Sequence, residues 1–257
     1  MIVSYVSNKK FYKYMVVSLY SLLSKNNNVD KVYLICEDDR IDDIDKLRSL
    51  VDEYNNVEFC IICLDKYIEK YLNKNSLNYN NYYSNYCFGK LLLANIIPED
   101  KVLYLDVDTI ISSDISNIWK YNIDSYYCAG VKDFAISYRG NLNELGINDK
   151  YINSGVVVFN LDKIRKDGIV DRMFDVINRR KLMYPDQDAL NIVCQYDILY
   201  LPNIYNVTYD VTLKMNNYSL AKIYHFAGKK PDGIINRPFG EEWAVVQEEF
   251  NNKFGWK

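Results

Sequence analysis

The start of the chain alternates between short apolar runs and segments with apolar residues at helical spacing. Residues 2–6 form a continuous apolar-rich run, which predicts a buried strand. Residues 11–23 carry apolar side chains three and four positions apart, which predicts an amphipathic helix. The same alternation continues with a strand at 32–36, a helix at 42–54 and a strand at 57–63. This order is typical of an α/β domain with parallel strand pairing.

Both patterns recur further along the chain, after one irregular segment. Residues 73–86 are rich in Asn and Tyr and lack periodicity, which predicts a loop. The remaining strands are expected at 102–105, 127–131, 156–160 and 198–201, and the remaining helices at 90–97, 169–180, 186–195 and 241–251. No internal repeat or low-complexity linker divides the sequence. We therefore expect a single domain over residues 1–257.

Composition excludes several classes of protein. The chain has 257 residues, enough for one large domain or two small ones at roughly 150 residues per domain. With 31 Lys and Arg against 34 Asp and Glu, the net charge is −3, so the chain lacks the basic field expected of a nucleic-acid-binding protein. No stretch approaches the ~20 apolar residues that span a bilayer, and no secretory signal precedes the first strand. We expect no transmembrane segment, although peripheral contact with a membrane stays open.

The cysteines indicate a reducing compartment. Most of the six lie in apolar surroundings, where free thiols are the usual state. Cys60 and Cys63 form a CxxC inside the strand expected at 57–63, whereas a redox motif would lie at a strand-to-helix turn. A zinc site would need a second pair of cysteines at similar spacing. We expect unpaired thiols and a cytoplasmic location.

The strongest chemical signal is the strand at 102–105, which runs directly into Asp106 and Asp108. In an extended segment, residues two positions apart point to the same side, so both carboxylates should face one spot at the carboxyl end of the strand. Ligands bind at that edge in open α/β sheets. Two close carboxylates repel one another unless a cation lies between them, and a divalent metal carrying a diphosphate meets this need. The alternative is a solvated turn. A phosphatase of the haloacid dehalogenase type is disfavoured because Ile110 stands where its Thr is required.

Three further segments carry polar groups in positions suited to a ligand. Residues 153–155 (Asn-Ser-Gly) open a predicted strand, and residues 186–188 (Asp-Gln-Asp) open a predicted helix with Asp186 as its expected N-cap. His225 is the only histidine of the chain. Residues 228–230 (Gly-Lys-Lys) combine close backbone approach with positive charge, as a phosphate site requires. Each segment alone is equally consistent with an ordinary turn, cap or core residue.

Together, the four segments resemble the retaining glycosyltransferases of family 8, the group that includes glycogenin and bacterial lipopolysaccharide galactosyl- and glucosyltransferases. The resemblance covers residues 2 to about 231. It implies a fold of the GT-A type, a Rossmann-like mixed α/β sheet with helices on both faces. The nucleotide-binding half would be about 1–110 and the acceptor half about 111–257. The implied activity moves a hexose from a UDP-sugar, UDP-glucose or UDP-galactose, to a hydroxyl of a cell-surface glycan or lipopolysaccharide-like acceptor.

The resemblance also implies a role for individual residues. Asp106, Asp108 and His225 would bind Mn²⁺ or Mg²⁺. Gln187 would lie near the anomeric carbon, and with Asp186 and Asp188 it forms the implied catalytic set. The residues implied to bind the donor and its metal are, in chain order, Val6, Asn8, Lys90, Asp106, Val107, Asp108, Asp133, Asn153, Gly228 and Lys230, with Lys229 as the alternative to Lys230.

Retention could arise by front-face attack or by double displacement. Gln187 is a poor nucleophile, which favours front-face attack, while the flanking Asp186 and Asp188 keep double displacement open. A nucleotidyltransferase would normally carry a Gly-rich basic loop after the first strand, and residues 7–10 lack Gly. A non-catalytic sugar-nucleotide-binding protein is the third possibility, because Lys9 and Lys10 depart from the family pattern.

Overall fold

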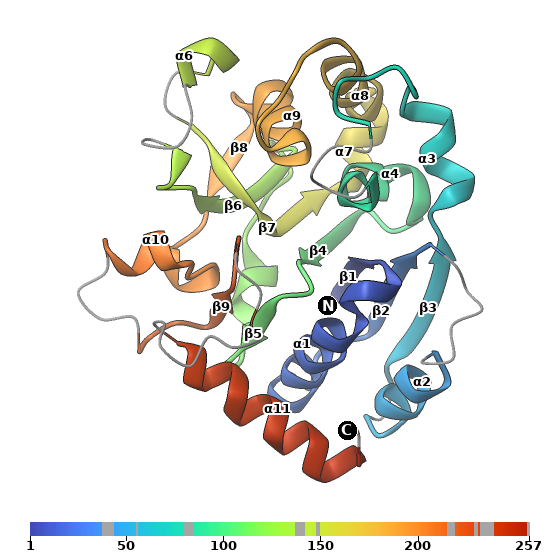
Figure 1. The fold of residues 1–257 in the computed structure, drawn as a ribbon. Helices are drawn as coiled ribbons and strands as arrows, with labels where there is room; N and C mark the ends of the chain where they lie inside the picture. The colour runs from blue at the N-terminus through green and yellow to red at the C-terminus, as the bar shows by residue number, and fades with distance from the viewer. Residues whose placement is uncertain are drawn as a thin grey trace.

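A seven-stranded mixed sheet forms the centre of the computed structural model (Figure 1). The structure describes residues 1–37, 44–54, 56–79, 85–136, 142–147, 150–214, 219–228, 231 and 239–255. The strands of the sheet are β1 (Ile2–Ser7), β2 (Lys31–Cys36), β3 (Glu58–Cys63), β4 (Lys101–Leu105), β6 (Cys128–Lys132), β7 (Ile152–Asn160) and β8 (Ile198–Tyr200). Their order is β3-β2-β1-β4-β7-β6-β8. β7 runs antiparallel to β4 and β6, and the other neighbouring strands are parallel.

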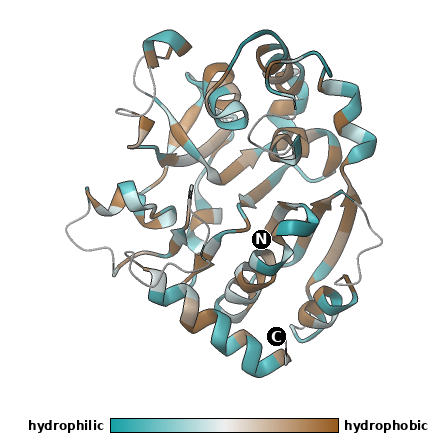
Figure 2. Cartoon of the chain, viewed as in Figure 1, coloured by the Kyte–Doolittle hydropathy of each residue, from teal (hydrophilic) through white to brown (hydrophobic). Residues whose placement is uncertain are grey.

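Helices cover both faces of this sheet, as expected from the sequence. One face packs against α1 (Tyr12–Lys25) and α2 (Ile44–Asp52), and α11 (Gly240–Phe254) packs in turn against α1. The other face packs against α3 (Asp65–Tyr71), α4 (Leu93–Ile96), α7 (Leu161–Lys166), α8 (Ile169–Arg179) and α9 (Pro185–Cys194). Alternate residues of β4 pack into the hydrophobic clusters on the two faces of the sheet, because successive side chains of a strand point to opposite faces. Figure 2 shows the resulting pattern of hydrophobic strands beneath helices of mixed hydropathy.

The prediction was wrong in two stretches. The segment expected as a helix at 90–97 begins as a 3₁₀ helix (Asn85–Leu92) and becomes α-helical only in α4. Gly89 in this 3₁₀ helix lies directly against β1, where an added Cβ would be 2.8 Å from Val6 Cγ1, so tertiary packing overrides the local periodicity. β7 begins four residues before the predicted 156, because Ile152 already pairs with Lys132 across a bulge. Of the loop expected at 73–86, residues 73–79 form no helix or strand, 80–84 lie outside the described residues, and 85–86 already belong to the 3₁₀ helix.

A small second sheet was not predicted, and it matters for the site. β5 (Thr109–Ile111) pairs antiparallel with β9 (Ile223–His225), with Thr109 opposite His225. Like β8, both strands have only three residues and no period of their own, and neither was singled out as an apolar run. The pairing joins the turn after β4 to a segment more than a hundred residues later in the chain. Four short helices were also missed: α3, α7, α6 (Leu142–Leu145) and α10 (Tyr209–Thr212).

All six cysteines are unpaired, as expected. Cys60 and Cys63 lie in β3, at one edge of the central sheet, and are partly buried. Burial and the neighbouring Glu58 raise the pKa of the Cys60 thiol, which disfavours the reactive thiolate. No helix among the described residues is both long and apolar enough to cross a membrane.

Candidate active site

A cavity of about 880 Å³ opens at the carboxyl ends of β1 and β4. Its walls also include the start of α1, the first half of β7, the start of α9 and the end of β9. Ligands of open α/β sheets bind at this edge, so the fold places the cavity where the sequence predicted a site.

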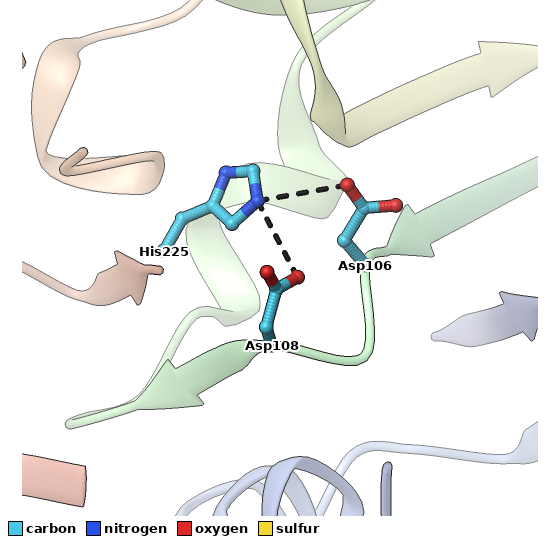
Figure 3. Close-up of side chains that lie close together, drawn as sticks. All are labelled: Asp106, Asp108 and His225. Atoms are coloured by element: carbon cyan, nitrogen blue, oxygen red, sulfur yellow. Dashed lines mark ion pairs between the residues drawn. The ribbon is translucent and has the colours of Figure 1, made fainter. Parts of the chain in front are cut away.

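Asp106, Asp108 and His225 converge in this cavity (Figure 3). The Nε2 atom of His225 lies 3.5 Å from Oδ2 of Asp106 and 3.6 Å from Oδ1 of Asp108. The two aspartates do not lie on an extended segment, as the sequence argument assumed; Val107 and Asp108 form a turn between β4 and β5. The turn aims both carboxylates at one point, and the pairing of β5 with β9 brings His225 to the same point.

His225 and Asp106 shift each other's pKa. Burial opposes a charge on His225, but the carboxylates of Asp106 and Asp108 outweigh this cost and raise the pKa of the imidazole to about 9. Burial also acts to raise the pKa of Asp106, yet Lys90, His225 and Tyr104 together hold it well below its usual range. Asp106 is therefore ionised at neutral pH.

Gly155 of β7 provides the room in which the imidazole lies. A Cβ on Gly155 would fall 2.1 Å from Cε1 of His225 and 2.8 Å from Oδ2 of Asp106.

Two carboxylates and one imidazole, with ligand atoms within 4.8 Å of one another, form a donor set suited to a divalent cation such as Mn²⁺ or Mg²⁺. The residues present therefore fit a metal of this class.

Lys90 lies between Asp106 and Asp186, which is at the start of α9. Its ammonium is 3.0 Å from Oδ1 of Asp106 and 3.0 Å from Oδ2 of Asp186, and it stacks over the ring of Tyr104. Burial disfavours this charge, but Asp106 and Asp186 raise the pKa of the lysine well above its ordinary value. The cation therefore stays charged and couples the two carboxylates.

A network of amides and one carboxylate forms part of the cavity wall. Oε1 of Gln187 accepts from the backbone N–H of Ser154 at 2.9 Å, and its Nε2 donates to Oδ2 of Asp133 at 2.9 Å. Nδ2 of Asn153 donates to the same oxygen at 3.2 Å. The other carboxylate oxygen of Asp133 accepts from the N–H of Ala135 at 2.7 Å. These bonds fix Asp133, Asn153 and Gln187 against the cavity.

The two aspartates that flank Gln187 have different surroundings. α9 begins at Pro185 with Tyr184 as its N-cap, so the expectation that Asp186 is the N-cap was wrong. Asp186 lines the cavity, whereas Asp188 is fully buried and is not part of the lining. The Asp188 carboxylate accepts from the Tyr151 hydroxyl and from the N–H groups of Met183 and Tyr184. Asp188 thus holds the turn before α9 instead of facing a ligand.

The remaining residues named from the sequence lie at the cavity or outside the described chain. Val6, Asn8, Val107 and Gly228 line the cavity. Lys230 and its alternative Lys229 lie outside the described residues. Sequence reasoning missed several lining residues that carry polar or charged groups: Lys10, Lys13, Tyr104, Thr208 and Asp210. Lys10 and Lys13 lie at or just before the start of α1, Tyr104 lies in β4, and Thr208 and Asp210 lie in a segment without a motif. No pattern of spacing in the sequence distinguishes them.

The chain is similar in sequence to a known family and to several known proteins. The model of the family described as Glycosyl transferase family 8 matches residues 2–231. The lipopolysaccharide 1,2-glucosyltransferase of Escherichia coli K12 is 29% identical over 126 residues, which cover 46% of this chain and 36% of that protein. Glycosyltransferase GlyB of Streptococcus pneumoniae is 23% identical over 215 residues, which cover 77% of this chain and 48% of that protein. The chain spans less than two thirds of the length of the curated relatives it matches.

Solved structures share the fold. The crystal structure of an active-site mutant of LgtC superposes with a TM-score of 0.78 at 18% identity, covering 97% of this chain and 96% of that one. The galactosyltransferase LgtC in complex with donor and acceptor sugar analogues gives a TM-score of 0.74 at 17% identity, with the same coverage. At this identity the likeness establishes the fold, which is of the GT-A type expected from the sequence.

Proposed function

Because the chain belongs to glycosyl transferase family 8, as its motifs indicated, we propose that it moves a hexose from a UDP-sugar to an acceptor hydroxyl. The family is shown; the activity of this chain, its donor, the metal and the sugar are our inference. The observation that carries it is the convergence of Asp106, Asp108 and His225 in the cavity. The donor would be UDP-glucose or UDP-galactose, and the acceptor a cell-surface glycan or lipopolysaccharide-like molecule. The lipopolysaccharide glucosyltransferase relative and the galactosyltransferase neighbour support this choice.

In this proposal Asp106, Asp108 and His225 would hold a divalent cation, Mn²⁺ or Mg²⁺, which would supply positive charge against the diphosphate leaving group. Val6 and Asn8 hold the uridine, and the backbone at Gly228 approaches the diphosphate, with Lys230 supplying positive charge. Residues 1–110 then serve mainly the nucleotide and 111–257 the acceptor. The unpaired thiols support the cytoplasm as the place where the protein acts.

The sugar would lie against Asp133, Asn153, Asp186 and Gln187. All four line the cavity, and their carboxylates and amides are suited to binding hydroxyl groups. Neither acid beside Gln187 is well placed as a nucleophile, because Asp186 is ion-paired with Lys90 and Asp188 is buried outside the lining. We therefore favour front-face attack, in which the departing phosphate oxygen takes the proton of the acceptor hydroxyl, with retention at the anomeric carbon.

A panel of UDP-sugars tests this function. The protein is incubated with Mn²⁺, each UDP-sugar and a hydroxyl acceptor, and the release of UDP is measured. We expect turnover with UDP-glucose or UDP-galactose, and proton NMR of the fresh product should show an α anomeric signal. Donor binding without UDP release would favour a non-catalytic sugar-nucleotide-binding protein. A β product would contradict retention.

Gln187→Ala should lower kcat by about 10²-fold while the KM for the donor changes little. The amide dipole of Gln187 would stabilise positive charge at the anomeric carbon, which develops mainly in the transition state. Steady-state kinetics with varied donor measures both constants. Gln195→Ala is the matched control: Gln195 caps the far end of α9, where its Nε2 donates to Ile192 O, and its loss should leave both constants unchanged. A rise in KM at constant kcat for Gln187→Ala would contradict the assigned role.

Metal affinity should rise with pH below about 9. The pKa of His225 is raised to about 9 without metal, so a metal ion must displace a proton from the imidazole at neutral pH. The apparent Mn²⁺ affinity should then increase about tenfold per pH unit between about pH 6.5 and 8.5. Isothermal titration calorimetry in buffers of different ionisation enthalpy measures both the affinity and the released proton. An affinity independent of pH would exclude His225 as a ligand.

A further inference from the structure

We propose that Asn206 is a positioning residue that holds the His225 ring so that Nε2 offers its lone pair to the metal site. The inference rests on the proposed metal site. Asn206 follows the 3₁₀ helix Asn203–Tyr205 and is fully buried. Its Oδ1 lies 2.9 Å from Nδ1 of His225, on the side of the ring opposite the aspartates.

Hydrogen bonds around Asn206 determine which way its amide points. The backbone N–H of Gly155 donates to Oδ1 of Asn153 at 3.0 Å, so this atom of Asn153 is an acceptor. Nδ2 of Asn153 faces a carboxylate oxygen of Asp133, which can only accept when ionised. The group that Asn206 presents to Asn153 Oδ1, at 2.9 Å, must therefore be its NH₂. The oxygen of Asn206 is then the atom that faces His225.

This orientation selects one tautomer of His225. An amide oxygen can only accept, so Nδ1 of His225 must carry a hydrogen. In the neutral imidazole the lone pair then lies on Nε2, the atom 3.5 and 3.6 Å from Asp106 and Asp108. The opposite tautomer would place two acceptors against each other in a buried site, and leaving a buried acceptor without a donor is costly.

The backbone keeps Asn206 in this position. Val207 follows Asn206 directly and forms a parallel bridge with Tyr224. The N–H of Val207 donates to Ile223 O at 2.9 Å, and the N–H of His225 donates to Val207 O at 3.0 Å. Asn206 and His225 are therefore fixed on neighbouring segments, and the amide can orient the ring without moving. Partners of this kind usually contribute 10- to 100-fold to metal affinity.

The experiment uses the fact that His225 is the only histidine, so ¹⁵N-histidine labelling gives one imidazole spin system. NMR detects the hydrogen on Nδ1 and its exchange with water, without metal and with diamagnetic Mg²⁺. Calorimetry measures Mn²⁺ affinity. With the ring neutral, either with Mg²⁺ bound or without metal at high pH, we expect wild-type protein to show a slowly exchanging Nδ1–H. Asn206→Leu should lose this signal and bind Mn²⁺ about 10- to 100-fold more weakly. Asn206→Asp keeps an acceptor at Nδ1, so the signal and part of the affinity should return.

Asn26→Leu is the matched control. Asn26 is also buried, accepts from the N–H of Ile115 and donates to Leu22 O, at the far end of α1 from the cavity. It should lose stability but keep the Nδ1–H signal and the Mn²⁺ affinity. An equal loss of Mn²⁺ affinity in Asn26→Leu would overturn the proposal. So would wild-type protein whose Nδ1 carries no protected hydrogen, a result that does not depend on any variant folding. Wild-type protein that shows the Nδ1–H signal but binds no Mn²⁺ would contradict the metal site, but not the hydrogen bond between Asn206 and His225.

Discussion

Asp108→Asn should lower turnover by at least ~10²–10³-fold, the loss typical of removing one electrostatic stabiliser from an active site. Asn has the same shape as Asp, but it removes one of the two negative charges that face His225. Asp108 is almost fully buried, so water cannot replace the lost charge. Mn²⁺ affinity should fall along with kcat, because the same carboxylate would bind the metal.

The control for this variant is Asp124→Asn, which makes the same change on an exposed turn outside the cavity lining. It should leave turnover, metal affinity and stability nearly unchanged. Calorimetric titration with Mn²⁺ and UDP release measured on the same protein samples separate binding from chemistry. Asp108→Asn protein with wild-type Mn²⁺ affinity would show that the ligand assignment is wrong.

Gly155→Ala should abolish metal binding and transfer while the chain still folds. The added Cβ would lie 2.1 Å from Cε1 of His225, a distance that forces the imidazole to move. Gly155 lies within β7 and is not among the positive-φ glycines, so Ala is tolerated by the backbone. The substitution should therefore displace the His225 and Asp106 side chains and lower kcat by at least ~10²-fold.

Gly130→Ala in β6 serves as the control for this substitution. The Cβ added there would meet the flexible Cδ1 end of Ile152 at 2.7 Å, which can rotate away. Thermal melting and Mn²⁺ titration of both variants should show some loss of stability in each, but loss of metal affinity only for Gly155→Ala. Retention of Mn²⁺ affinity in Gly155→Ala would show that the imidazole is not part of the metal site.

Much of the fold follows from periodicity in the sequence. The seven strands of the central sheet and the longer helices match their predicted places to within a few residues, because the buried strands appear as apolar runs and the helices carry an apolar face that repeats every 3.6 positions. β5 and β9 were not predicted, since their pairing depends on the rest of the fold and not on a pattern within either strand. The 3₁₀ helix before α4 depends likewise on the contact of Gly89 with β1.

The site was predictable where its residues are close in sequence. Asp106 and Asp108 follow a strong strand signal, and their convergence was expected, although a turn and not an extended segment produces it. His225 comes from a distant strand, and only the resemblance to a family linked it to them. Asn206 and Gly155 act through contacts with His225 that no pattern in the sequence reports. Thr208 and Asp210 reach the cavity from a segment without a motif for the same reason.

The central claim is that sugar transfer depends on a divalent metal held by Asp106, Asp108 and His225. It is tested most directly by measuring UDP release from the accepted UDP-sugar with no addition, with excess EDTA, and with EDTA followed by excess Mn²⁺. We expect turnover to stop in EDTA and to return when Mn²⁺ exceeds the chelator, because two facing carboxylates and a diphosphate require a cation between them. Full turnover in excess EDTA would contradict the claim.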